Sequence, residues 1–209
     1  MRVLVGALVV VAVAVAGCSS SAADPTSPCA TGYLGDPTAA PELELRALKA
    51  DGTDVPLADG DDLAILFPPQ GGRVAFVGIR VRNVDGCAMQ ITGALRDPVS
   101  KQLRLDGRTT NLRRDTDGWG ISGRGVTTNI ADSAEIGDYA NVPICPNQWA
   151  SQDIYDQRFT LDVQVVDRAG KHADRTLTVV PRCAEPGDRA TSCQCLCKEG
   201  YVLGETCTP

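Results

Sequence analysis

The sequence predicts an all-β fold, an antiparallel β-sandwich or a related barrel, from three observations. Short runs alternate apolar and polar residues with the two-residue period of a strand, most clearly over residues 73–84 and 158–166. Pairs rich in Gly, Pro and Asp, which favour turns, separate these runs. No long run shows the apolar period of an amphipathic helix. We therefore expect one β-domain over residues 42–183.

The first strand is expected over residues 43–49, "LELRALK", where apolar side chains occupy alternate positions. The Leu and Ala content leaves a short helix as the alternative. The clearest strand is "RVAFVGIRVRNV", residues 73–84, with Val77, Ile79 and Val81 on one face and Arg80 and Arg82 on the other. Asp85 and Gly86 then form a turn signal, and alternation resumes at Cys87 in "CAMQITGAL". The sequence therefore predicts a hairpin here, with one face exposed to water.

The middle of the chain, residues 97–157, is less regular and contains many breaks at Gly and Pro. Short strands are expected at "QLRLDG" (102–107) and "GVTTNI" (125–130). Trp119 and Trp149 are expected to pack on the core or its rim. Ligand stacking by Trp119 on an exposed loop is the alternative.

A second hairpin is expected over residues 158–183, "RFTLDVQVVDRAGKHADRTLTVVPRC", with its turn at 167–171. Alternating apolar residues are followed by V-x-D-x-x-G and by a second alternating strand. This stretch resembles the last two strands of bacterial immunoglobulin-like and PKD-type domains. The resemblance implies an antiparallel immunoglobulin-like β-sandwich.

Residues 1–17 are expected to be a signal peptide, because Arg2 precedes an uncharged apolar run. The run falls short of the roughly 20 residues that span a membrane, although a short anchor helix remains the alternative. Residues 15–18, Val-Ala-Gly-Cys, resemble the lipobox of bacterial lipoproteins. That resemblance implies cleavage before Cys18, a thioether-linked diacylglycerol on its thiol, and acylation of its new amino group.

More than one acyl chain would make the attachment to the membrane stable. Ser19 after the cysteine resembles an outer-membrane address in diderm bacteria, so we expect a periplasmic or cell-surface lipoprotein. Residues 18–41 are rich in Ser, Ala, Pro, Thr and Gly, and are expected to be a flexible tether. Cys29 is expected to pin part of this tether to the folded domain.

The chain has nine cysteines. If Cys18 carries lipid, an even number remains, and in an exported chain these predict four disulfides whose pairing the sequence leaves open. The disulfide candidates are Cys29, Cys87, Cys145, Cys183, Cys193, Cys195, Cys197 and Cys207.

Residues 184–209 form a cysteine-rich tail with few apolar side chains, so we expect covalent bridges to hold it. A bridge within C-x-C is strained, so Cys193 and Cys195 are expected to reach elsewhere, one of them to Cys183. The stretch "CLCKEGYVLGETC" matches the spacing C-x-C-x-x-G-aromatic followed by a cysteine after four to eight residues, and it resembles half of an EGF-like module. The resemblance implies a disulfide that joins the last two cysteines of this stretch, Cys197 and Cys207.

Charge and composition narrow the function. A net charge of −6 provides no basic footprint for nucleic acid, and an aromatic content of 4% leaves few stacking platforms. His172, the only histidine, is expected to be exposed at the hairpin turn, and no nucleophile, zinc-protease or phosphate-loop motif is present. Acidic clusters at 51–54, 59–62 and 115–118 are expected to form turns, with calcium binding as the alternative.

These observations predict a membrane-anchored envelope lipoprotein that is not an enzyme. We expect it to bind or scaffold an envelope protein or glycan, without nucleic acid and without a cofactor beyond the lipid on Cys18. One alternative is an envelope hydrolase that uses carboxylates. Another is a periplasmic metal-binding protein that uses the C-x-C-x-C thiols of Cys193, Cys195 and Cys197.

Overall fold

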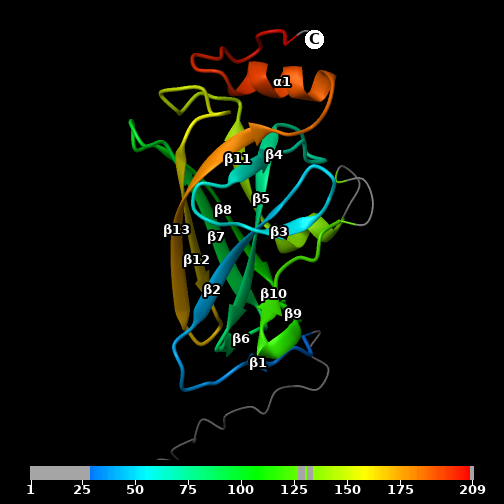
Figure 1. The fold of residues 1–209 in the computed structure, drawn as a ribbon, viewed down its shortest axis with the longest axis vertical. Helices are drawn as coiled ribbons and strands as arrows, with labels where there is room; N and C mark the ends of the chain where they lie inside the picture. Colours follow the sequence, from blue (N-terminus) through cyan, green and yellow to red (C-terminus); the bar gives the residue numbers. More distant parts are fainter. Residues whose placement is uncertain (1–28, 127–129, 131–133, 208–209) are drawn as a thin grey trace, which may run out of the picture.

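The computed structural model describes residues 29–126, 130 and 134–207, which form a mostly β structure with one α-helix (Figure 1). The larger sheet contains β2 (Glu42–Leu48), β3 (Asp54–Pro56), β5 (Arg73–Arg82), β9 (Arg113–Arg114), β10 (Gly120–Ile121) and β11 (Ala140–Cys145). The smaller sheet contains β4 (Asp62–Ile65), β7 (Met89–Arg96), β8 (Leu103–Thr110), β12 (Phe159–Val166) and β13 (His172–Cys183). A short ribbon pairs β1 (Tyr33–Leu34) with β6 (Val84–Asp85).

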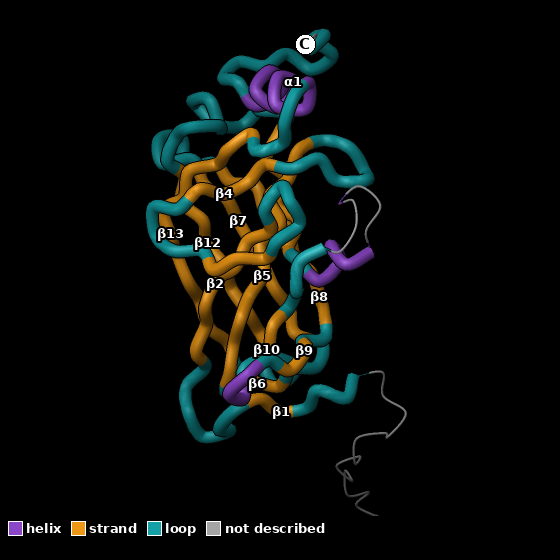
Figure 2. Tube along the Cα trace, turned by 45° about the vertical axis from the view of Figure 1, so that its right-hand side comes forward, coloured by secondary structure: helices purple, strands orange, loops and turns teal. Residues whose placement is uncertain are grey.

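Among the described residues, the helical segments include α1 (Asp188–Cys197) and the 3-10 turns Thr116–Gly118 and Ala134–Asp138. Figures 1 and 2 agree that α1 lies at one end of the long axis of the molecule and that β1 lies at the other. The strands of both sheets run between these two ends (Figure 2).

The sheets curl around a common hydrophobic core, which collects the inward-facing side chains of both. In β5 the residues predicted for one face, Val77, Ile79 and Val81, are fully buried. Where β7 crosses β11, the sheets approach closely: a Cβ atom on Gly93 would lie 3.0 Å from a methyl carbon of Val142. Glycine therefore favours this close approach, because a methyl group there would press on the Val142 side chain.

The strand expected over residues 43–49 is confirmed as β2, which pairs with β5. The strand expected over 102–107 is confirmed as β8. The stretch 125–130 is not a strand where the structure describes it, at Gly125 and Val126, and residues 127–129 lie outside the described part.

The predicted hairpin across Asp85–Gly86 is wrong, because β5 and β7 belong to different sheets. The chain does turn there, since the Asp85 carboxylate accepts a hydrogen bond from the Cys87 amide at 3.0 Å. It turns into the opposite sheet, where β7 pairs with β8 and β12. A two-residue period identifies the buried face of a strand but carries no information about its partner.

The second hairpin is confirmed. β12 and β13 pair antiparallel from Phe159 opposite Val179 to Val166 opposite His172, and the Asp167 amide closes the turn with the Lys171 carbonyl at 2.9 Å. The expectation of purely antiparallel sheets needs one correction, because β4 pairs with β13 in parallel. The smaller sheet is therefore mixed.

The N-terminal boundary of the domain also needs correction. Residues 29–41, expected to belong to the tether, are part of the fold: Leu34 is fully buried and β1 pairs with β6. The predicted attachment through Cys29 is confirmed by its disulfide with Cys87. Residues 18–28, like the lipobox and Cys18, lie outside the described residues.

Candidate functional site

The C-terminal cap, residues 184–207, covers the end of the domain that carries α1 (Figure 1). Its buried apolar side chains are only Cys193, Cys197 and Tyr201 among the described residues. A segment this poor in apolar contacts needs covalent support, as the sequence predicted.

Three disulfides supply this support, and with the Cys29–Cys87 bridge they confirm the predicted total of four. The bridges of the cap are Cys145–Cys197, Cys183–Cys193 and Cys195–Cys207. The expected link from Cys183 into the C-x-C region is confirmed. The pairing of Cys197 with Cys207 implied by the EGF-like resemblance is wrong, because Cys197 reaches back to β11. An α-helix, not a two-stranded loop, carries the first cysteines of that motif.

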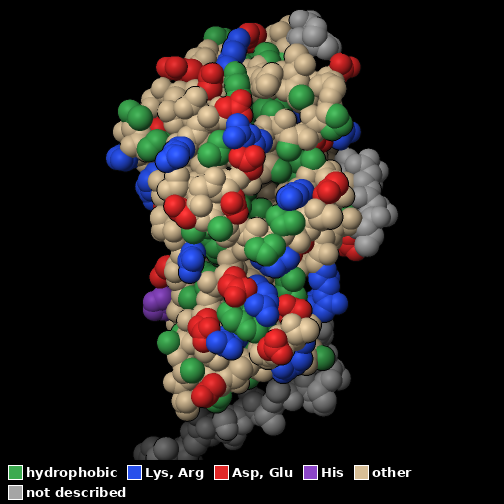
Figure 3. All heavy atoms as spheres, viewed as in Figure 1, with side chains coloured by type: hydrophobic (Ala, Val, Ile, Leu, Met, Phe, Trp, Pro, Cys, Tyr) green, Lys and Arg blue, Asp and Glu red, His purple; other side chains and the backbone are tan. Residues whose placement is uncertain are grey.

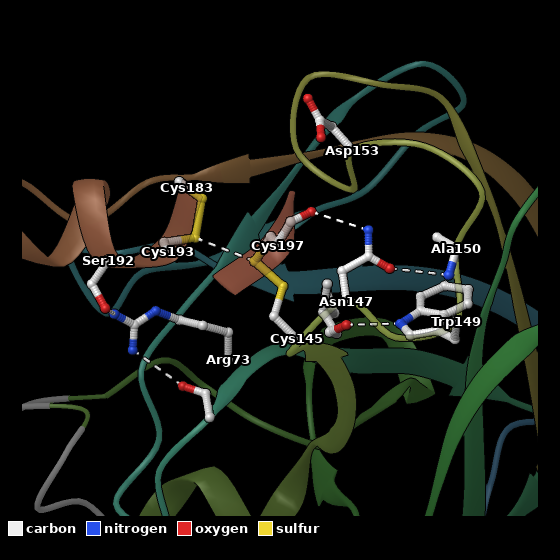
Figure 4. Close-up of a disulfide and its surroundings, with 12 residues drawn as sticks. Arg73, Cys145, Asn147, Trp149, Ala150, Asp153, Cys183, Ser192, Cys193 and Cys197 are labelled. Carbon is white, nitrogen blue, oxygen red and sulfur yellow. Dashed lines mark hydrogen bonds between the residues drawn. A yellow bond between two sulfur atoms is a disulfide. The ribbon is translucent and has the colours of Figure 1, made fainter. Parts of the chain in front are cut away.

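The helix explains why three alternating cysteines find three different partners. Positions four apart share one helix face, so Cys193 and Cys197 both point at the domain, where they are buried, while Cys195 bonds outward to Cys207. The Sγ atoms of Cys193 and Cys197 lie 3.8 Å apart, so two disulfides are in contact (Figure 4). With Cys183 they form the only potential metal-binding group among the described residues, but each sulfur is bonded to another sulfur.

Asn147 ties the cap to the loop after β11. Its backbone N–H donates to the Leu196 carbonyl at 2.8 Å, and its side-chain nitrogen donates to the Gln152 carbonyl at 2.9 Å. The side-chain nitrogen also donates to the Cys197 carbonyl at 3.3 Å (Figure 4). The bonds to Leu196 and Cys197 satisfy backbone carbonyls at the C-terminal end of α1, which lack partners within the helix.

Trp149 lies in the same loop and is buried, which confirms its predicted place in the core. Its indole N–H donates to the Ile144 carbonyl at 2.9 Å, and its ring packs edge-on against Phe159. Trp119 is also buried, and the guanidinium groups of Arg80 and Arg82 lie 4.3 and 4.8 Å from its ring centre. That ring therefore already has cationic partners from its own chain.

Asp97 fastens the loop from the other side. This fully buried carboxylate accepts hydrogen bonds from the backbone and hydroxyl of Ser151, from the Val99 amide and from the Ser100 hydroxyl. Burial acts to raise the pKa of Asp97, but these hydrogen bonds outweigh it and lower the pKa to about 2.

Arg73, at the start of β5, lies beneath α1 and is 3% exposed. Its guanidinium donates to the Gly72 carbonyl at 3.1 Å, and to the Arg189 carbonyl and the Ser192 hydroxyl at 3.3 Å (Figure 4). Sequence reasoning missed this residue, because nothing in a β-strand pattern distinguishes a buried arginine from an exposed one.

The carboxylates of the acidic clusters accept hydrogen bonds in turns or form ion pairs with arginine. Asp51 accepts hydrogen bonds from Thr53, Asp59 from the Thr178 amide and Asp61 from the Ala58 amide. Asp62 and Asp115 pair with arginines from other strands. His172 is exposed as the first residue of β13, as predicted.

A second buried carboxylate is Asp54, which the sequence placed in a turn of the acidic cluster 51–54 and which instead begins strand β3. Arg46 pairs with one of its oxygens, while the other oxygen is buried without a hydrogen-bond partner. Burial raises the pKa of Asp54 despite Arg46, and burial together with Asp54 raises the pKa of Tyr139. Asp54 lines a polar pocket of about 460 Å³ with arginines at 46, 114 and 124.

No protein-family model matches the chain, and no curated protein matches it. None of the helices in the described part of the chain is both long and apolar enough to cross a membrane.

Proposed function

We propose that this chain is a bacterial envelope lipoprotein, anchored through Cys18, that binds or scaffolds an envelope protein or glycan through its C-terminal cap. One observation carries the proposal. Cys29 and its disulfide partner Cys87 flank the β1–β6 pair in the chain, and β1 lies at the end of the domain opposite α1 (Figure 1).

This placement would orient the domain on a membrane. The eleven residues from Cys18 to Cys29 can span at most about 40 Å when fully extended. A lipid on Cys18 would hold the β1 end toward the membrane and present the cap on the far side. Three disulfides also restrain the cap, and rigid elements position a binding site more accurately than mobile ones.

Binding fits the surface better than hydrolysis. Acidic and basic side chains are interspersed on the face shown in Figure 3, and many described carboxylates form ion pairs with arginine. The β12–β13 hairpin supports the proposal that the domain is immunoglobulin-like, an architecture that serves many unrelated binding functions.

Lipid labelling in a bacterial host tests the anchor. The Cys18→Ala variant should lose incorporated palmitate and leave the membrane fraction, whereas the matched Ser19→Ala variant should keep both. Continued labelling of Cys18→Ala would eliminate this attachment site.

Site-specific photocrosslinking tests the binding surface. A photoreactive residue at Leu203, which is 70% exposed on the cap, should capture an envelope component. The same residue at exposed Thr38, near β1, is the control. Adducts from Thr38 alone, or turnover of a polysaccharide or ester by the purified protein, would contradict the proposal.

A further inference from the structure

A small cavity of about 220 Å³ lies where the N-terminal half of α1 meets the start of β5. It is lined by Phe67, Arg73, Asp188, Arg189 and Ser192. We propose that this cavity binds a monocarboxylate with a small apolar body, held by Arg73 and Arg189 against Phe67. The inference rests on the proposed function, a binding role for the cap, and deepens it by naming the ligand class; it does not depend on the lipid anchor.

Arg73 is a buried cation without a carboxylate partner. No described carboxylate oxygen forms an ion pair with it within 4.0 Å, and its Nε has no hydrogen-bond partner. Its three hydrogen bonds go to neutral oxygens at 3.1 to 3.3 Å, which is long for a charged donor. Burial and nearby Arg189 lower the pKa of Arg73, and Glu185 opposes them. Such a buried charge is unfavourable unless an anion compensates it.

Arg189 places a second positive charge at the same spot. The guanidinium carbons of Arg73 and Arg189 lie 4.8 and 5.7 Å from the centre of the Phe67 ring. One buried carboxylate serves this pair: Glu185 bonds to Arg189 at 2.8 Å through one oxygen, and its other oxygen has no partner. The arrangement leaves Arg73 without an anion of its own.

The surrounding elements favour an anion of low charge. The N-terminus of α1 carries a partial positive charge. Its N-cap residue, Gly187, has no side chain that could accept a hydrogen bond from the first backbone N–H groups of the helix. Asp188 is exposed at the rim, where water screens its charge, but it disfavours a dianion. Ser192 adds a hydroxyl donor. A carboxylate matches the planar fork of an arginine, and Phe67 offers an apolar wall to the rest of the ligand.

The volume limits the ligand further. Pockets for drug-sized molecules usually exceed about 300 Å³, so this cavity suits a body no larger than a single ring. A benzoate-like acid or a short-chain acid fits this description. The carboxyl-terminal residue of a peptide offers the same chemistry from a macromolecular source.

The test uses the mature chain with Cys18→Ser, produced in an oxidising compartment so that the four bridges form. Benzoate, acetate, inorganic phosphate and an amidated and a free-carboxylate phenylalanine peptide are titrated and followed by amide NMR shifts. We expect saturable benzoate binding with shifts at Arg189 and Ser192, weaker acetate and phosphate binding, and binding of the peptide only when its carboxylate is free. Binding of benzoate without the peptide would assign the site to free small acids.

Variants locate the site. Arg189→Gln should weaken benzoate binding about ten-fold or more, the usual effect of losing a charged hydrogen bond. Arg175→Gln, an exposed arginine of β13, makes the same charge change and should leave the affinity unaltered. Phe67→Ala should reduce the preference for benzoate over acetate, and it tests the cavity without replacing the buried Arg73.

Three results would overturn the inference: no saturable benzoate binding at millimolar concentration, equal weakening by Arg175→Gln, or tighter binding of phosphate than of benzoate. Because the Cys18→Ser chain lacks the lipid site, this outcome and that of the palmitate experiment are independent. A negative result for carboxylate binding would leave the proposed lipid anchor untouched, and a negative palmitate result would leave the proposed carboxylate site untouched.

Discussion

The two ends of the domain are fastened by different means. The N-terminal segment, residues 29–40, is held by one disulfide, by the fully buried Leu34 and by a set of hydrogen bonds. The C-terminal cap is held by three disulfides and has few buried apolar side chains. An end that buries apolar and hydrogen-bonding groups can lose a bridge and stay in place, whereas the cap has little to replace one.

Lys171 is the centre of the hydrogen bonds at the N-terminal end. From the β12–β13 turn, its ammonium group donates to the Tyr33 hydroxyl and to the carbonyls of Pro37, Ala39 and Asn83, all at 2.8 to 3.0 Å. Gly35 allows the close approach of this segment to Asn83, because a Cβ atom there would lie 2.4 Å from the Asn83 side-chain oxygen. The segment is thus fitted to the domain in detail.

Removing one long-range bridge at each end is the strongest test of this difference. The bridges close segments of similar length, with sequence separations of 52 for Cys145–Cys197 and 58 for Cys29–Cys87. Chain entropy therefore predicts a similar loss of unfolding free energy for each double Cys→Ala variant, about 4 kcal/mol. Local order should differ: amide exchange should accelerate in α1 without Cys145–Cys197, while residues 33–40 stay protected without Cys29–Cys87. Equal protection of α1 in both variants would remove the distinction.

Lys171→Met addresses the N-terminal end alone. Four acceptors lose their charged donor, so we expect a loss of about 2–3 kcal/mol in unfolding free energy, measured by chemical denaturation. Amide exchange should rise in residues 33–40 and remain unchanged in α1. Lys49→Met, at an exposed lysine, is the control and should change stability little. Unaltered exchange in residues 33–40 would show that Leu34 and the disulfide hold this segment without Lys171.

Acid should loosen the other end. The pKa of Asp97 in the folded protein, about 2, lies below the ordinary value of 3.8, so its ionised form stabilises the fold above pH 4. That contribution, about 2 kcal/mol, is lost as the pH falls from 4 toward 2. Residues 146–158, next to the cap, should exchange first. Asp97→Asn should flatten this part of the pH–stability curve, whereas Asp174→Asn, at an exposed residue of β13, should not. An unchanged slope in Asp97→Asn would assign the acid sensitivity to other carboxylates.

The sequence predicted local features well. The buried face of β5 and the whole β12–β13 hairpin follow from period and turn chemistry, which depend on neighbours in the chain. It predicted the number of disulfides by parity, but the EGF-like spacing misled the pairing of Cys197. It also assigned residues 29–41 to a tether, because a segment without an apolar period can still be folded when it borrows hydrogen bonds from distant strands.

The sequence by itself therefore determined the buried face of the regular strands, such as Val77, Ile79 and Val81 in β5, and that the cysteines form bridges, since alternation and parity are properties of the chain. Only the tertiary structure decided that β5 and β7 lie in opposite sheets, that Cys197 bonds to β11, and that Arg73 meets Arg189 under α1. Cys145 and Cys197, like Arg73 and Arg189, lie far apart in the chain, whereas β5 and β7 are close in the chain and are separated into two sheets by packing. Their partners are selected by how two curled sheets and a cap pack together, and no local pattern encodes that packing.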